Sequence, residues 1–84
     1  KKGGDFMKES KVILNSIDDV KEFVALANRC VFDVDLLSGR YAVDAKSIMG
    51  IFSLDLTKTL TLVVHDDGEK ADDFLDGIKQ FIAE

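Results

Sequence analysis

The sequence contains no proline, no tryptophan, one histidine and one cysteine. A single cysteine excludes an internal disulfide framework and a zinc site built from several cysteines. A single histidine leaves too few imidazoles for most small catalytic or metal sites. The longest apolar runs are only a few residues, whereas a membrane span needs about 20. We therefore expect a reduced, cytoplasmic protein that is not an enzyme and uses no metal or cofactor.

Basic residues are outnumbered, with 11 Lys and Arg against 16 Asp and Glu and a formal net charge of −5. Nucleic-acid binding requires a basic surface that neutralises phosphates, so this balance argues against a nucleic-acid partner. Hydrophobic residues make up 46% of the chain, which is enough to drive folding. At 84 residues there is room for one domain with a thin core, because a domain of this size buries only about 60% of its unfolded surface.

The first six residues differ in composition from the rest of the chain. They contain two lysines and two adjacent glycines, and they have no apolar segment of the signal-peptide kind. We expect residues 1–6 to be an added or disordered tail and Met7 to be the natural start. Residues 7–84, which contain no internal repeat or linker, are then expected to form the domain.

Alternation of apolar and polar residues predicts four strands. They lie at residues 11–14, 31–37, 40–44 and 59–65. Ser38-Gly39 separates the second strand from the third and predicts a hairpin turn. In the fourth strand Leu62 and Val64 are expected on an inner face and Val63 on the outer face.

Helical spacing predicts three helices. One follows Ser16, a short one follows Ser47, and the last has apolar positions from Ala71 to Ile82. Both serines are typical N-cap residues. Because each strand has one apolar face and each helix one apolar stripe, the expected fold is α+β, in the order β-α-β-β-α-β-α. It consists of a four-stranded antiparallel sheet with three helices on one face.

Residues 44–54, which read Asp-Ala-Lys-Ser-Ile-Met-Gly-Ile-Phe-Ser-Leu, resemble the histidine-containing phosphocarrier (HPr) family of the bacterial sugar phosphotransferase system. Gram-positive members have a very similar segment with a Lys-Ser-Ile-Met-Gly core, and the spacing from Phe23 to Ser47 also fits the family. The resemblance covers residues 11–84 and implies the family's open-faced β-sandwich. It also implies that Ser47 is a regulatory phosphorylation site, modified by a dedicated serine kinase/phosphorylase in catabolite control.

The chain departs from the family in the active loop, which in the family reads Gly-x-His-x-Arg-Pro. Ser16 aligns with the phospho-accepting His, Asp18 with the Arg and Asp19 with the Pro. A serine phosphoester is far less labile than the phosphohistidine that a relay needs. Each aspartate would repel a phosphoryl group by roughly 1 kcal/mol or more near a surface. We therefore expect no catalytic residue here and no phosphohistidine relay.

The apolar residues after Ser47 are the second candidate site. In the resembled family a patch beside the regulatory serine meets partner proteins, and exposed apolar clusters often mark docking surfaces. We predict that Ile48, Met49 and Phe52 contact a protein partner, the alternative being ordinary core packing. The main hypothesis is a non-catalytic, HPr-like regulatory or adaptor protein. The alternatives are a phosphocarrier with an unrecognised acceptor and a small interaction domain unrelated to sugar transport.

The other chemistry-bearing residues have simpler interpretations. Ser16 and Ser47 can both act as plain N-caps. His65 is expected to point outward, and its spacing from the following aspartates matches no metal-binding loop. The acidic residues of the last helix are expected to form a solvated face. Cys30 is expected to be a small buried hydrophobic residue.

Overall fold

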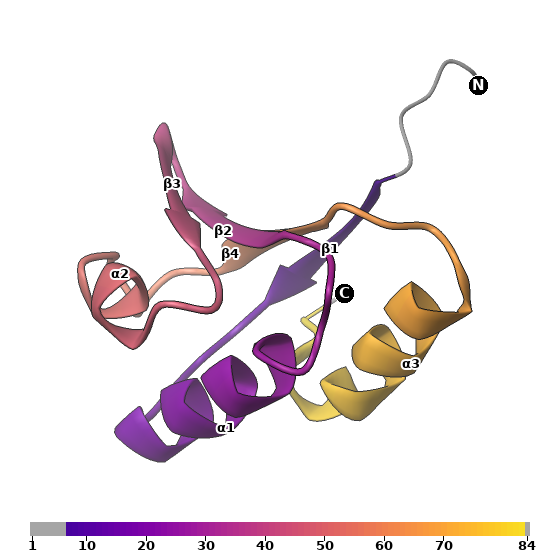
Figure 1. Cartoon of the computed structure of the whole chain (residues 1–84). Coiled ribbons are helices and arrows are strands. Elements are labelled where there is room, and N and C mark those ends of the chain that lie inside the picture. Colours follow the sequence, from indigo (N-terminus) through magenta and orange to yellow (C-terminus); the bar gives the residue numbers. More distant parts are fainter. Residues whose placement is uncertain (1–6, 84) are drawn as a thin grey trace.

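Strand β4 (Leu60–Val64) lies inside a four-stranded antiparallel sheet in the computed structural model, which describes residues 7–83. It pairs with β1 (Lys8–Val12) on one side and with β2 (Val34–Ser38) on the other. Strand β3 (Tyr41–Asp44) pairs with β2, so the order is β1-β4-β2-β3 (Figure 1). The predicted tail, residues 1–6, lies outside the described part of the chain.

Three α-helices cover one face of this sheet. Helices α1 (Ile17–Ala27) and α3 (Glu69–Gly77) lie next to each other beneath it, and α2 (Ile48–Phe52) packs against α1 and β3 (Figure 1). A 3₁₀ turn (Lys79–Phe81) follows α3. The predicted α+β architecture is therefore confirmed. Gly39, with φ of +60°, forms the predicted hairpin turn, a conformation that glycine adopts without strain.

The core is built from the inner faces of the strands and from aromatic residues of the helices. Leu62 and Val64 are fully buried, as the alternation predicted. Phe23 of α1 is also fully buried and makes edge-to-face contacts with Phe74 and Phe81, at ring-centroid distances of 6.1 and 6.2 Å. These aromatic pairs join α1 to the C-terminal segment. Edge-to-face contacts of this kind stabilise a fold by more than the burial of their apolar area alone.

Two element boundaries differ from the prediction at the same place. The first strand ends at Val12 rather than at residue 14, and the last helix ends at Gly77 rather than extending to Ile82. The C-terminal segment instead runs beside the first strand. Val12 forms a β-bridge with Ile82, and the Ile13 amide donates to the Phe81 carbonyl at 2.8 Å. Backbone pairing at the sheet edge thus outweighs the helical periodicity of the sequence.

The burial of one outward-facing residue and the start of the second strand also depart from simple alternation. Val63 lies on the outer face but is only 8% exposed, because Glu9 and Asp35 stand beside it on the neighbouring strands. The second strand begins at Val34 instead of Val31, and Val31 is 84% exposed in the loop before it. Neither outcome follows from alternation alone, since both depend on which neighbours cover the residue.

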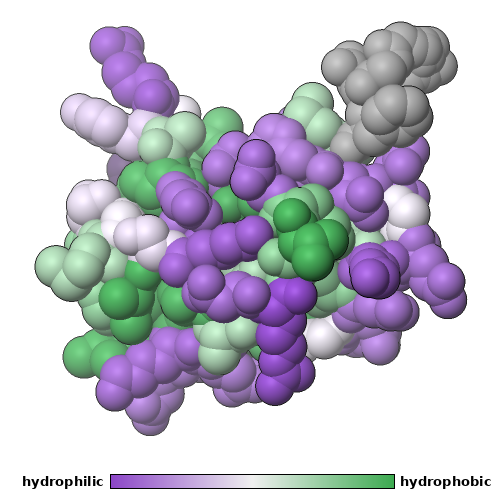
Figure 2. Space-filling model, viewed as in Figure 1, coloured by the Kyte–Doolittle hydropathy of each residue, from purple (hydrophilic) through white to green (hydrophobic). Residues whose placement is uncertain are grey.

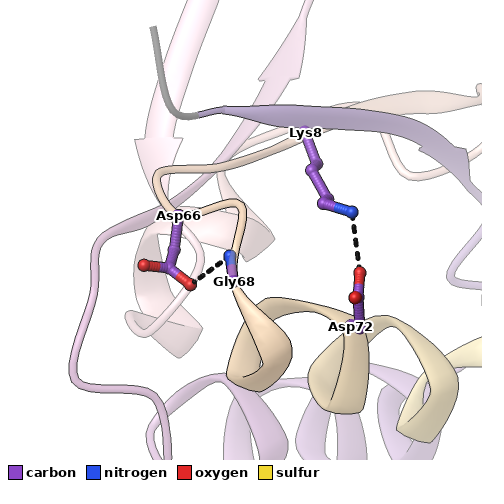
Figure 3. Close-up of polar contacts among 4 residues, drawn as sticks. All are labelled: Lys8, Asp66, Gly68 and Asp72. Carbon is purple, nitrogen blue, oxygen red and sulfur yellow. Dashed lines mark hydrogen bonds and ion pairs between the residues drawn. The ribbon is translucent and has the colours of Figure 1, made fainter. Parts of the chain in front are cut away.

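An ion pair connects the sheet to α3. Lys8 Nζ lies 2.7 Å from Asp72 Oδ1, while at the start of the same helix Asp66 Oδ2 accepts from the Gly68 amide at 3.0 Å (Figure 3). The hydrogen bond to Asp72, reinforced by its charge, raises the pKa of Lys8 above its ordinary value of 10.5. A raised pKa in the folded state stabilises the fold below pH 10.5, and this contribution is lost as the pH rises through the raised value.

Candidate functional site

Ser47 forms the N-cap of α2. Its Oγ accepts a hydrogen bond from the Gly50 amide at 3.1 Å, which satisfies one of the free N–H groups at the helix start. A side chain at position 50 would crowd this bond, because a Cβ there would lie 3.3 Å from Ser47 Oγ and 3.3 Å from Val43 Cβ. The helix is therefore held close to β3, and the Ser47 side chain is half-buried.

The segment before Ser47 is tied to the C-terminal end of α1. Asn28 Nδ2 donates to the Lys46 carbonyl at 3.1 Å, and Lys46 Nζ donates to the Cys30 carbonyl at 2.9 Å. Asp44 Oδ1 accepts from the Lys46 amide at 2.9 Å. Lys46, the cation next to the candidate phosphorylation site, is thus already engaged with the backbone. The sequence carries no signal for the bonds of Lys46 to Asn28 and Cys30, since these partners lie 18 and 16 positions away along the chain.

The α2 patch, defined as Ile48, Met49 and Phe52, faces solvent to different degrees. Met49 is 75% exposed, Phe52 is 41% exposed and Ile48 is half-buried, whereas the neighbouring Ile51 is fully buried. Ile51 anchors the helix in the core, and Ile48 packs against the core from its edge. Figure 2 shows apolar atoms gathered at the α2 end of the molecule, above the hydrophilic atoms that lie along α1.

Ser16 forms the N-cap of α1, as predicted. Its Oγ accepts from the Asp19 amide at 3.1 Å, and Asp19 Oδ2 accepts from the Asn15 amide at 3.0 Å. These reciprocal bonds resemble a capping box, and they lie in the loop that aligns with the family's active loop. Asp18 and Asp19 lie in the first turn, where negative charge interacts favourably with the helix dipole.

Replacing the Ser16 cap should cost stability without altering the fold. Ser16→Ala removes the acceptor for the Asp19 amide, and the expected loss in free energy of unfolding is about 1 kcal/mol. Urea unfolding followed by circular dichroism measures this loss. Thr59→Ala, at an exposed position before β4, is the control and should change stability by about 0.5 kcal/mol or less. Equal losses in the two variants would show that the cap contributes nothing.

His65 and Cys30 are the single histidine and the single cysteine of the chain. His65 Nε2 lies 2.8 Å from Asp35 Oδ2, on the exposed side of the sheet. Cys30 is partly buried against the core, and burial raises the pKa of its thiol, although the charge of Lys46 acts in the opposite direction. Among residues 7–83, no cluster of three or more potential ligand side chains is arranged to hold a metal ion. Over the same residues, no helix is both long and apolar enough to cross a bilayer.

Comparison with known proteins identifies a family and several structures to which this chain is similar. The sequence model described as "PTS HPr component phosphorylation site" matches residues 19–84. The crystal structure of a phosphocarrier protein HPr from Bacillus anthracis str. Ames is 26% identical, with a TM-score of 0.68, over 92% of this chain and 98% of that chain. A search of curated proteins gave no match.

Two more distant structures have the same fold. HPr-C-His from Thermoanaerobacter tengcongensis is 20% identical, with a TM-score of 0.67, over 87% of this chain and 88% of that chain. The histidine-containing phosphocarrier protein of Mycoplasma is 17% identical, with a TM-score of 0.64, over 88% of each chain. Both structures therefore show the same fold over most of this chain.

Proposed function

This chain belongs to the HPr family of the phosphotransferase system, and from that membership we propose that it is a cytoplasmic, non-catalytic regulatory or adaptor protein. It acts through Ser47 and the α2 patch, and a serine kinase/phosphorylase of the HPr type modifies it. Residues 7–84 form the functional unit. The observation that carries the proposal is an N-cap serine next to two exposed apolar side chains, Met49 and Phe52.

The loop at Ser16 supports the non-catalytic part of the proposal. The family match begins at Asp19 and does not extend over Ser16. Ser16 Oγ already caps α1, and the loop presents the carboxylates of Asp18 and Asp19 where a phosphoryl group would need a cation. A phosphoryl donor approaching this loop would meet like charge, so transfer would be slow even with a nucleophile present.

The surroundings of Ser47 support the regulatory part. A phosphate on Ser47 would lie among the free N–H groups at the start of α2, which tolerate negative charge. It would also lie near Lys46, whose ammonium would have to leave the Cys30 carbonyl in order to pair with it. Phosphorylation would therefore change both the charge beside the α2 patch and the link between α1 and α2.

The proposal predicts modification at one site. Incubation with ATP and an HPr-type serine kinase should add one phosphate, and peptide mass spectrometry should locate it on Ser47. Ser47→Ala should abolish the modification. Ser53→Ala is the matched control, because Ser53 caps the other end of the same helix, and this variant should be phosphorylated like the wild type. A phosphate on Ser53, or no phosphate on the wild type, contradicts the regulatory proposal.

The alternative of a phosphocarrier with an unrecognised acceptor has one observation in its favour. His65 is the sole histidine, and the Asp35 carboxylate beside its Nε2 leaves Nδ1 as the nitrogen available for attack. No cation of the described residues pairs with either side chain to stabilise a phosphoryl group. Acid-labile phosphate on His65 after incubation with phosphoenolpyruvate and the first enzyme of the system would favour this alternative. An interaction domain unrelated to sugar transport would be modified by neither enzyme.

A further inference from the structure

A cavity of about 410 Å³ opens between the C-terminal end of α1 and α3, and neither Ser16 nor Ser47 lines it. Five apolar or weakly polar side chains line it, namely Leu26, Cys30, Val31, Phe32 and Phe74. Its size falls within the range of small-molecule sites, which are mostly apolar with a few polar groups. None of the α2 patch lines the cavity, although Cys30, which does, has its carbonyl bonded to Lys46 next to Ser47.

Charged groups at the cavity favour an anionic ligand. Arg29 and Lys70 line it together with one carboxylate, Asp73, which leaves a local charge of +1 in a chain of net charge −5. The ion pairs found among residues 7–83 join Lys8 to Asp72, His65 to Asp35 and Lys79 to Asp76. Within that part of the chain, therefore, neither Arg29 nor Lys70 forms an ion pair with a carboxylate.

We propose that this cavity binds a small apolar carboxylate. The apolar body of the ligand occupies the space between Phe32 and Phe74. Its carboxylate accepts charge-assisted hydrogen bonds from the Arg29 guanidinium and the Lys70 ammonium. Val31, which also lines the cavity and is 84% exposed, loses contact with water when the ligand is bound. Figure 2 shows apolar atoms ringed by hydrophilic ones near the middle of this face, where the connection from α1 to β2 passes in Figure 1.

Titration with 3-phenylpropanoate, followed by amide chemical shifts of the intact protein, tests the site. We expect saturable shifts at Leu26, Phe32 and Gly77, with a dissociation constant of about 1 mM or lower. The neutral amide of the same acid should bind about tenfold more weakly. Shifts that stay linear over the titration, or equal binding of the amide, would overturn the proposal.

Two charge variants and a footprint complete the test. Arg29→Gln and Lys70→Gln should each weaken binding by about tenfold. Lys79→Gln, which removes the same charge from outside the cavity, should bind like the wild type. Cys30 is the only cysteine, so its rate of alkylation by iodoacetamide should fall when 3-phenylpropanoate is bound. An unchanged alkylation rate at saturation, or equal binding by all three variants, would place the ligand elsewhere and overturn the proposal.

Discussion

Phe23→Ala should reduce the free energy of unfolding by about 3–5 kcal/mol, which is a typical cost for removing a buried phenylalanine ring. Phe23 is fully buried and makes edge-to-face contacts with Phe74 and Phe81. Its loss would leave a void among α1, α3 and the C-terminal turn and would remove both aromatic contacts. Domains of this size are stable by only about 5–15 kcal/mol, so the variant should be close to unfolding.

The matched control for this prediction is Phe52→Ala. The same atoms are removed, but Phe52 is 41% exposed on the α2 patch and buries less area. Urea unfolding should therefore give a loss of about 1.5 kcal/mol or less for Phe52→Ala. A similarly small loss in both variants would mean that Phe23 does not hold the helical layer together. A similarly large loss in both would mean that Phe52 is structural rather than available to a partner.

Ser16→His combined with Asp18→Arg should create acid-labile phosphorylation at the loop that we propose has lost it. The first change supplies a nucleophilic imidazole at the start of α1, where the helix dipole favours its neutral form. The second replaces a repulsive charge with an attractive one. Removing the repulsion and adding the attraction should each lower the barrier by about 1 kcal/mol. Together they correspond to about a thirtyfold gain in transfer rate over Ser16→His alone.

The measurement is the rate of acid-labile phosphate formation with phosphoenolpyruvate and the first enzyme of the phosphotransferase system. Ser16→His with Asp18→Asn is the control, because it removes the repulsion without adding a cation and should give an intermediate rate. Circular dichroism should give the same helix content for all three variants. Equal rates for Asp18, Asn and Arg at this position would show that loop charge does not limit transfer.

Local signals in the sequence predicted much of the fold and both capped helix starts. The interior of β4, the hairpin turn at Gly39 and the caps at Ser16 and Ser47 all depend on neighbouring residues. Propensity and periodicity describe such neighbourhoods well. The resemblance at residues 44–54 agrees with the family match over residues 19–84. The fold class therefore needed no tertiary information.

Tertiary contacts decided the features that the sequence did not predict. The last helix stops at Gly77 because the segment after it pairs with Val12 at the sheet edge. Val63 is covered by side chains from two other strands, and Lys46 is held by a carbonyl of the loop after α1. Each of these contacts joins segments distant in sequence, so no window of periodicity contains both partners.

The wild-type protein belongs to the HPr family, and we propose that it has lost phosphoryl transfer. The fold retains the open sheet and the capped α2. The loop, however, has Ser16 in place of an imidazole, and it has Asp18 and Asp19 where a cation would be needed. The most direct test is to incubate the unmodified full chain with phosphoenolpyruvate and the first enzyme, with an active HPr as the positive control. We predict no acid-labile phosphate on the wild type. A stoichiometric acid-labile adduct would contradict this account.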